Sequence, residues 1–306
     1  MMQEREQGPV RRQPAGGLAP LGRRAGKAIQ SVCLGALLMA SVGGFGIAYA
    51  QALPRPDHIV IVVEENHAYR QIIGNPQAPY INALAKRGML FTQSYGVAHP
   101  SQPNYLALFS GSTQGVVSDD CPLQFTGPNL ASALAAKGLR FVTYAESLPA
   151  PGALDCGRGA YQRKHNPAAN WAGLQGTLLP FSEFPENLAK LPTVAMVIPD
   201  QDNDMHDGSI EDGDAWLKMN MERYAQWALA HNSLLIVTWD EDDFAGDNRI
   251  ATILVGAMVR SGTSAQRINH YAVLRTIEEM YGLPYINESA HATAIAGVWQ
   301  AGLPRK

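Results

Sequence analysis

The sequence lacks several of the motifs by which enzymes are commonly recognised. It contains no P-loop and no glycine-rich dinucleotide-binding motif, so neither of these nucleotide-binding sites is predicted. Gly-x-Ser-x-Gly is also missing, and 110–112 (Ser-Gly-Ser) does not fit it, which argues against an α/β-hydrolase. No internal repeat and no low-complexity tract interrupts residues 51–306.

An excess of positive charge is also absent. The 306 residues carry a formal net charge of −3, and residues 1–50 contribute +4 to it, which leaves −7 on residues 51–306. Proteins that bind nucleic acid in bulk need a basic face, so no nucleic-acid partner is predicted. A small phosphorylated substrate remains compatible with this charge, because a bound metal ion can invert the local sign.

The first 50 residues have the features of a secretory signal peptide. A basic start precedes a short apolar run over 32–48, which ends in Ala48-Tyr49-Ala50, a small-x-small site for signal peptidase. A membrane anchor is the alternative, but the run is short and interrupted by glycines. We therefore expect a periplasmic or secreted product without stable membrane insertion, consisting of one domain over 51–306.

Cysteines are scarce, and only Cys121 and Cys156 follow residue 50. Because disulfides persist in exported proteins, this pair is expected to form one. Two buried free thiols are the alternative.

Apolar runs and turn residues predict an α/β fold. Strands alternate with helices, which implies a mostly parallel central sheet with helices on both faces. The strands are expected at 58–63, 140–144, 193–198, 234–239 and 250–255, and the helices at 79–87, 128–137, 216–230 and 270–281. The loop-rich stretch 147–184 is expected to form an insertion or lid over the site. The oligomeric state is not predicted.

Polar clusters follow three of these strands. Glu65 and Asn66 come after the first strand, and Asp240 and Glu241 come after the strand at 234–239. Ligands of such sheets bind beyond the carboxyl ends of the strands, and carboxylate and amide oxygens suit a divalent cation. These four residues are therefore candidate metal ligands, with solvated acidic strand ends as the alternative.

Ser101 is the candidate nucleophile. A serine followed by proline two residues later indicates the start of a helix. The free N–H groups and the dipole at that point stabilise an alkoxide and a bound phosphate, and a metal ion can lower the pKa of the hydroxyl. A plain N-cap is the alternative, and the nearby His99 and Asn104 favour the functional interpretation.

The third cluster, 200–207, surrounds His206 with four aspartates. Their mutual repulsion is costly unless a cation or a basic partner is present, although a solvated acidic loop remains the alternative. His165 is either a phosphate contact from the lid or a surface histidine. His270 begins the last expected helix, where it either reaches the site or caps the helix.

Together these segments resemble a bacterial phosphoesterase family that contains acid phosphatase A-type enzymes and non-haemolytic phospholipases C, within the alkaline phosphatase superfamily. The resemblance implies an alkaline-phosphatase-like fold and a phosphoesterase catalytic domain. The matching segments, which span nearly all of residues 51–306 in order, are 63–67, 99–105, 144–149, 161–167, 203–207, 239–243 and 274–278.

The resemblance also implies roles for individual residues. Ser101 would be the nucleophile and would touch a divalent metal ion held by Glu65, Asn66, Asp240 and Glu241. Asn104 would donate to a phosphoryl oxygen. His206 would bind the phosphoryl group or a second metal ion, and would donate a proton to the leaving group.

Two features depart from the superfamily pattern. Two-zinc members have an Asp-His pair where this chain has Asp240-Glu241, so one metal site is expected, with a second as the alternative. The superfamily spacing selects Asp202 as the partner of His206, whereas the related family selects Asp204. His165, His270 and His99 are further candidates for phosphate or second-metal contacts.

The predicted activity is hydrolysis of a phosphoric ester through a phosphoserine at Ser101. An acid phosphatase-type phosphomonoesterase is favoured, because no extra C-terminal domain for lipid or choline is evident. A phospholipase C-type phosphodiesterase is the nearest alternative, with a phospholipid as its substrate. A periplasmic protein that only binds phosphorylated ligands is a further alternative, although a pure binder needs no nucleophile.

Overall fold

A computed structural model describes residues 53–301. The expected signal peptide lies outside the described residues. Within the described part of the chain, no helix is sufficiently long and apolar to cross a bilayer.

A single large sheet forms the centre of the protein. Its strands lie in the order β10-β2-β9-β8-β1-β7-β3-β6, and β11 also pairs with β2. The strand bounds are β1 His58–Glu64, β2 Met89–Tyr95, β3 Phe141–Ala145, β6 Leu178–Pro180, β7 Val194–Ile198, β8 Ser233–Trp239, β9 Arg249–Val255, β10 Gly262–Ser264 and β11 Ile268–Asn269. Every strand pair in this sheet is parallel except those made by β9, which is antiparallel to β8 and β2. The prediction of a mostly parallel α/β sheet is confirmed.

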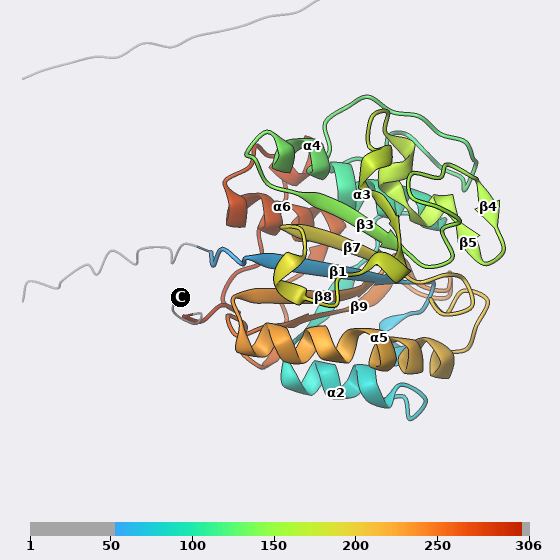
Figure 1. Ribbon diagram of the computed structural model, residues 1–306. Helices are drawn as coiled ribbons and strands as arrows, with labels where there is room; N and C mark the ends of the chain where they lie inside the picture. Colours follow the sequence, from blue (N-terminus) through green and yellow to red (C-terminus); the bar gives the residue numbers. More distant parts are fainter. Residues whose placement is uncertain (1–52, 302–306) are drawn as a thin grey trace, which may run out of the picture. The chain divides into compact units, whose positions relative to one another are not determined.

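Helices cover both faces of the sheet (Figure 1). One face carries α2 Pro79–Arg87 and α5 Ile210–Ala230, and the other carries α3 Ser101–Ser110, α4 Leu130–Ala135 and α6 His270–Tyr281. A short helix, α1 Tyr69–Ile72, follows β1. Alternate residues of β1 enter the two cores, with Ile59 and Ile61 on one face and Val60 and Val62 on the other. Because β1 is buried on both faces, its continuous apolar sequence was a reliable signal.

The expected elements agree with the structure within a few residues, with informative exceptions. Helix α5 begins at Ile210 rather than 216, because Ser209 caps it by accepting a hydrogen bond from the Asp212 amide at 3.1 Å. Helix α4 is shorter than expected and ends at Ala135. Strand β2 was not predicted, because its second half alternates polar residues into a partly exposed surface.

The loop-rich stretch 147–184 folds onto the body of the protein. It contains the hairpin of β4 Gly157–Arg158 and β5 Tyr161–Gln162, several 3₁₀ turns, and β6, which is an edge strand of the central sheet. The buried part of this stretch includes Tyr161 and Trp171, which belong to the hydrophobic core. The stretch is therefore anchored at both its middle and its end.

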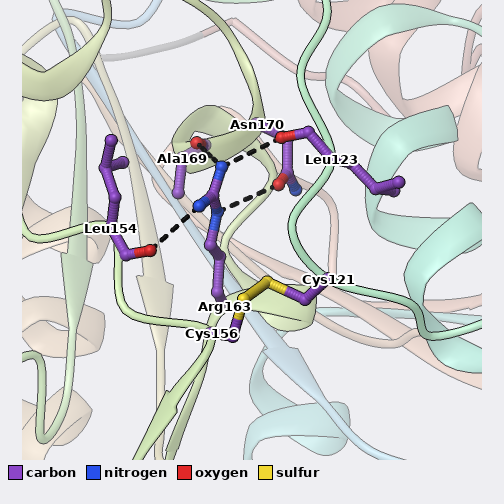
Figure 2. Close-up of a disulfide and its surroundings, with 7 residues drawn as sticks. All are labelled: Cys121, Leu123, Leu154, Cys156, Arg163, Ala169 and Asn170. Carbon is purple, nitrogen blue, oxygen red and sulfur yellow. Dashed lines mark hydrogen bonds between the residues drawn. A yellow bond between two sulfur atoms is a disulfide. The ribbon is translucent and has the colours of Figure 1, made fainter.

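The expected disulfide between Cys121 and Cys156 is present, with a Cα–Cα distance of 5.7 Å (Figure 2). It joins the loop that follows α3 to the stretch that carries β4 and β5.

Candidate active site

The carboxyl ends of β1 and β8 bring two polar clusters together. The two strands pair in parallel up to Glu64 and Trp239, so the residues that follow each strand lie next to each other. The amide of Asn66 donates to Asp240 Oδ1 at 3.1 Å. Asn66 adopts a φ of 46°, in the left-handed region that asparagine tolerates better than most residues. These strand ends lie together because β1 and β8 are neighbours in the sheet, and the local sequence does not reveal this strand order.

Ser101 lies against these strand ends. It is the first residue of α3, after a cis peptide bond between His99 and Pro100, so it is not the N-cap. Its hydroxyl donates to Glu65 Oε2 at 2.9 Å and lies 3.3 Å from Glu241 Oε1. The side chain is almost completely buried. We call Glu65, Asn66, Ser101, Asp240 and Glu241 the oxygen cluster.

The side-chain amide of Asn66 contacts three oxygens of the oxygen cluster. Its amide oxygen faces three other oxygens, namely Glu65 Oε2 at 2.9 Å, Ser101 Oγ at 3.2 Å and Asp240 Oδ1 at 3.3 Å. Rotating the amide would turn its NH₂ group toward these acceptors, and a cation among the oxygens would relieve the same conflict. Carboxylate, amide and hydroxyl oxygens are a donor set for a hard or borderline divalent ion.

A second group shares Glu65 with the oxygen cluster. His165 Nε2 lies 3.3 Å from Glu65 Oε1, and His165 Nδ1 lies 3.3 Å from Asp204 Oδ2. We call Glu65, His165 and Asp204 the histidine cluster, and its potential ligand atoms all lie within 4.8 Å of one another. His165 Nε2 and Asp204 Oδ2 are buried without a hydrogen-bond partner among residues 53–301. This group could therefore hold a metal ion.

Burial and mutual repulsion raise the pKa values of these carboxyl groups. Desolvation is the largest cause in each case, and it raises the pKa of Asp240 to about 7 and that of Asp204 to about 8. For Glu241, desolvation and the charge of Asp240 raise the pKa to about 9. Without a cation, the site thus favours neutral carboxyl groups near neutral pH.

The sequence did not decide whether Asp202 or Asp204 acts together with His206. Asp202 is exposed, whereas Asp204 is 1% exposed and belongs to the histidine cluster. Asp204 Oδ1 also accepts a hydrogen bond from the His206 amide at 2.8 Å. Of the two aspartates, only Asp204 is therefore placed to reach a ligand of the site.

His206 lies at the rim of the site. Its side chain is 26% exposed, and Nδ1 lies 2.7 Å from Asp207 Oδ1. Its ring centroid is 6.1 Å from that of His165. His206 is thus the more accessible of the two histidines.

Three other candidate site residues, Asn104, His99 and His270, contact the loop before Ser101 or the residues after β8. Asn104 is fully buried, and its side chain bonds the backbone of the loop before Ser101, with Oδ1 accepting from the Val97 amide at 2.8 Å and Nδ2 donating to the Ala98 carbonyl at 2.9 Å. His99 Nδ1 lies 2.5 Å from Glu241 Oε2. His270 Nε2 donates to the Asp240 carbonyl at 2.6 Å. Asn104 therefore stabilises the loop that precedes Ser101.

Two further residues, Tyr105 and Lys164, contact the site or the loop next to α3 and were not identified from the sequence. The hydroxyl of Tyr105 donates to Glu65 Oε1, and its ring stacks on His165 at 5.2 Å. Lys164 pairs with Asp119, which binds the first turn of α3. A buried tyrosine or a single lysine carries no local signal, because such residues are common in cores and on surfaces.

A family model described as the Phosphoesterase family matches residues 75–284. The chain belongs to this family. It is 48% identical over 279 residues to a phosphatidylinositol-3-phosphatase of Mycobacterium tuberculosis, covering 89% of this chain and 93% of that protein. It is also 31% identical over 228 residues to an acid phosphatase of Aspergillus fumigatus, covering 66% of this chain and 50% of that protein. This phosphoesterase is therefore a phosphoric-ester hydrolase, and it spans half the length of that fungal relative.

Solved structures support the fold of the phosphoesterase. A protein of the alkaline phosphatase superfamily from Vibrio parahaemolyticus aligns with a TM-score of 0.57 at 12% identity, covering 79% of this chain and 71% of that chain. A phosphonate monoester hydrolase of Agrobacterium radiobacter aligns with a TM-score of 0.51 at 12% identity, covering 75% and 74% of the two chains. The alkaline-phosphatase-like fold expected from the sequence is confirmed.

Proposed function

We propose that this phosphoesterase is an exported, metal-dependent phosphomonoesterase in which Ser101 attacks phosphorus and forms a phosphoserine. The observation that carries the proposal is the position of the Ser101 hydroxyl among the oxygens of Glu65, Asn66 and Glu241. The buried hydroxyl donates its proton toward these acceptors, and a serine must lose this proton to act as a nucleophile.

The oxygen cluster would hold one divalent ion, and the histidine cluster is the candidate for a second. Such an ion would lower the pKa of the Ser101 hydroxyl and neutralise charge on a phosphoryl oxygen. Asn104 and His99 would keep the loop and Glu241 in place around the nucleophile.

His206 is the proposed proton donor to the leaving group. Its Nδ1 contacts Asp207 Oδ1 at 2.7 Å, so Nε2 is the ring nitrogen left to donate to the leaving group. Asp204 binds the His206 amide and so fixes the position of this residue relative to the histidine cluster.

A monoester substrate is favoured by the relatives. The mycobacterial protein that is 48% identical is named a phosphatase, as are the fungal proteins, and none of these names describes a diesterase. The first of these names makes a phosphate on a lipid headgroup one candidate substrate. Export is supported by the sequence of residues 1–50 and by the disulfide, since disulfides persist in oxidising compartments.

The decisive experiment replaces Ser101 with alanine. We expect Ser101→Ala to lower kcat on p-nitrophenyl phosphate by about 10⁴-fold or more, because nucleophilic attack is lost. Acid quenching of the wild-type reaction with ³²P-labelled substrate is expected to trap label on Ser101. Ser261→Ala, at an exposed position, is the matched control and should retain wild-type activity.

Four results would each contradict a part of this proposal. Activity of Ser101→Ala close to that of wild type would contradict the assignment of Ser101 as the nucleophile. Full activity after exhaustive chelation would contradict the requirement for a metal ion. A higher kcat/KM on a phosphocholine diester than on p-nitrophenyl phosphate would identify the phospholipase C-type alternative. Binding of phosphate without any turnover would identify a binding protein.

A further inference from the structure

Lys164 pairs with Asp119 next to the first turn of α3, and it belongs to neither the oxygen cluster nor the histidine cluster. Its ammonium group is 2.9 Å from Asp119 Oδ2, and its side chain is 15% exposed. The other oxygen of Asp119 accepts a hydrogen bond from the amide of Gln102 at 3.0 Å. Because Gln102 follows Ser101 in the first turn of α3, the Asp119 carboxylate links Lys164 directly to the helix that carries the nucleophile.

The positive charge of Lys164 reaches both clusters. It lowers the pKa of Glu65, which the two clusters share, against the larger effect of burial. It also lowers the pKa of Asp204 and of Glu241, again against burial. The geometry agrees with this, because Asp119 bridges the ammonium group to the amide of Gln102, the residue that follows Ser101.

The segments that carry Lys164 and Asp119 are fastened together by a dense set of contacts (Figure 2). The Cys121–Cys156 disulfide joins them, and the Arg163 amide donates to the Cys156 carbonyl at 2.9 Å. The guanidinium of Arg163 donates to the carbonyls of Leu154 at 2.9 Å and Leu123 at 2.9 Å. It also donates to the Ala169 carbonyl at 2.7 Å and to Asn170 Oδ1 at 3.1 Å. Lys164 is the next residue, so its backbone is held rigidly.

Among residues 53–301, the ammonium group of Lys164 has one hydrogen-bond partner, Asp119. It has three N–H groups, and the ion pair with Asp119 engages one of them. A phosphate monoester brings a dianionic phosphoryl group to Ser101, whereas a diester brings a monoanionic one. A fixed positive charge stabilises the dianion more, because the Coulomb energy grows with the charge on the ligand.

We propose that Lys164, held by Asp119, is a specificity-determining residue that contacts the phosphoryl oxygens and favours dianionic monoesters over monoanionic diesters. This inference rests on the proposed function in one respect, namely that the phosphoryl group sits at Ser101. Arg163 and the disulfide act as positioning elements, since they fix the backbone on which Lys164 lies.

The test compares two substrates that share a leaving group and differ in charge, p-nitrophenyl phosphate and methyl p-nitrophenyl phosphate. We expect Lys164→Gln to lower kcat/KM on the dianionic monoester by about 10- to 100-fold, the range expected for one charge-assisted hydrogen bond. The loss on the diester should stay below about threefold. Lys164→Arg retains the charge and should restore most of the selectivity.

A binding measurement separates this proposal from the proposed nucleophile. Inorganic phosphate is titrated calorimetrically into Ser101→Ala and into the double variant Ser101→Ala/Lys164→Gln. The double variant should bind phosphate about tenfold more weakly at pH 8, where phosphate is a dianion. Lys190→Gln, at an exposed lysine on the same type of short turn, is the matched control and should change neither measurement.

The proposal is overturned if Lys164→Gln lowers kcat/KM equally on both substrates, or if the double variant binds phosphate as tightly as Ser101→Ala. A failure of Ser101→Ala to abolish turnover would instead contradict the nucleophile while leaving the phosphate-binding comparison intact. Circular dichroism of each variant checks that the fold is retained.

Discussion

The two sides of Ser101 are built in different ways. On one side, the ends of β1 and β8 place Glu65, Asn66, Asp240 and Glu241, and parallel pairing fixes their relative positions. On the other side, Asp119, Lys164 and His165 come from loops and 3₁₀ turns that a disulfide and Arg163 hold together. A sheet edge positions side chains through backbone pairing, whereas the loop side depends on a few specific bonds.

This difference predicts how the two sides respond to substitution. On the side formed by the strand ends, replacing a buried carboxyl group is expected to change the reaction catalysed at the site but to leave the sheet intact. The loop side carries bonds whose loss releases a segment and weakens both stability and substrate binding. Each of the following predictions tests one side of this comparison.

On the side formed by the strand ends, to which β7 belongs because it pairs in parallel with β1, the largest of these effects is expected in the acidic loop after β7. Asp204→Asn replaces one carboxyl group of the histidine cluster with an amide and should lower kcat by about 100-fold, in the range for loss of one electrostatic contact in an active site. Asp202→Asn, two residues away and exposed, should stay within about twofold of wild type. Steady-state rates on p-nitrophenyl phosphate check both values. Equal effects of the two substitutions would contradict the distinction drawn between these residues.

The loop side is tested by removing the disulfide. The double variant Cys121→Ser/Cys156→Ser should lose about 3 kcal/mol of unfolding free energy, since the bridge closes a loop across a sequence separation of 35. Its KM for p-nitrophenyl phosphate should rise by about tenfold, because Lys164 and Asp119 are no longer fastened together. Urea unfolding and steady-state kinetics measure the two effects. An unchanged KM in a destabilised variant would show that Arg163 alone holds the segment.

The smallest effect concerns the pH dependence of stability of the metal-free protein. Burial raises the pKa of Asp240, Asp204 and Glu241 to about 7, 8 and 9. Groups with raised pKa values stabilise the fold at low pH, and this contribution is lost as the pH rises through the folded-state values. Chelated protein should therefore melt at least about 5 °C lower at pH 9 than at pH 6.

A divalent ion should reverse this loss, because it replaces the protons on these carboxyl groups. The increase in Tm on adding metal should thus be larger at pH 9 than at pH 6. Differential scanning calorimetry at both pH values makes the measurement. An increase that is equal at the two pH values would show that the ion does not bind to these carboxyl groups.

Much of the fold was predictable because the decisive signals are local. The apolar run of β1 is continuous because the strand is buried on both faces, and α6 ends at Gly282, which adopts a φ of 61°. Strand β2 and the early start of α5 were missed, since a half-exposed strand and a polar first turn carry weak apolar patterns. The edge strand β6 was missed because it lies within a stretch rich in turn residues.

The candidate site was predictable in part for the same reason. Glu65, Asp240 and Ser101 were identified because each follows or begins an element that the sequence marks clearly. Two contacts were not predictable from the sequence, because both depend on the path of one loop. His99 contacts Glu241, and the side chain of Asn104 bonds backbone groups of residues 97 and 98. The proposed roles of all these residues remain predictions for the experiments above.

The sequence by itself determined the α/β fold, the disulfide pair and the strand ends that carry the acids, because apolar periodicity, cysteine scarcity and strand boundaries are properties of short stretches of chain. Only the tertiary structure decided that Asp204 rather than Asp202 faces His165, and that Asp119 joins Lys164 to the first turn of α3. These contacts join residues brought together by strand order, by the disulfide and by the buried Arg163. Such long-range packing leaves no pattern in the local sequence.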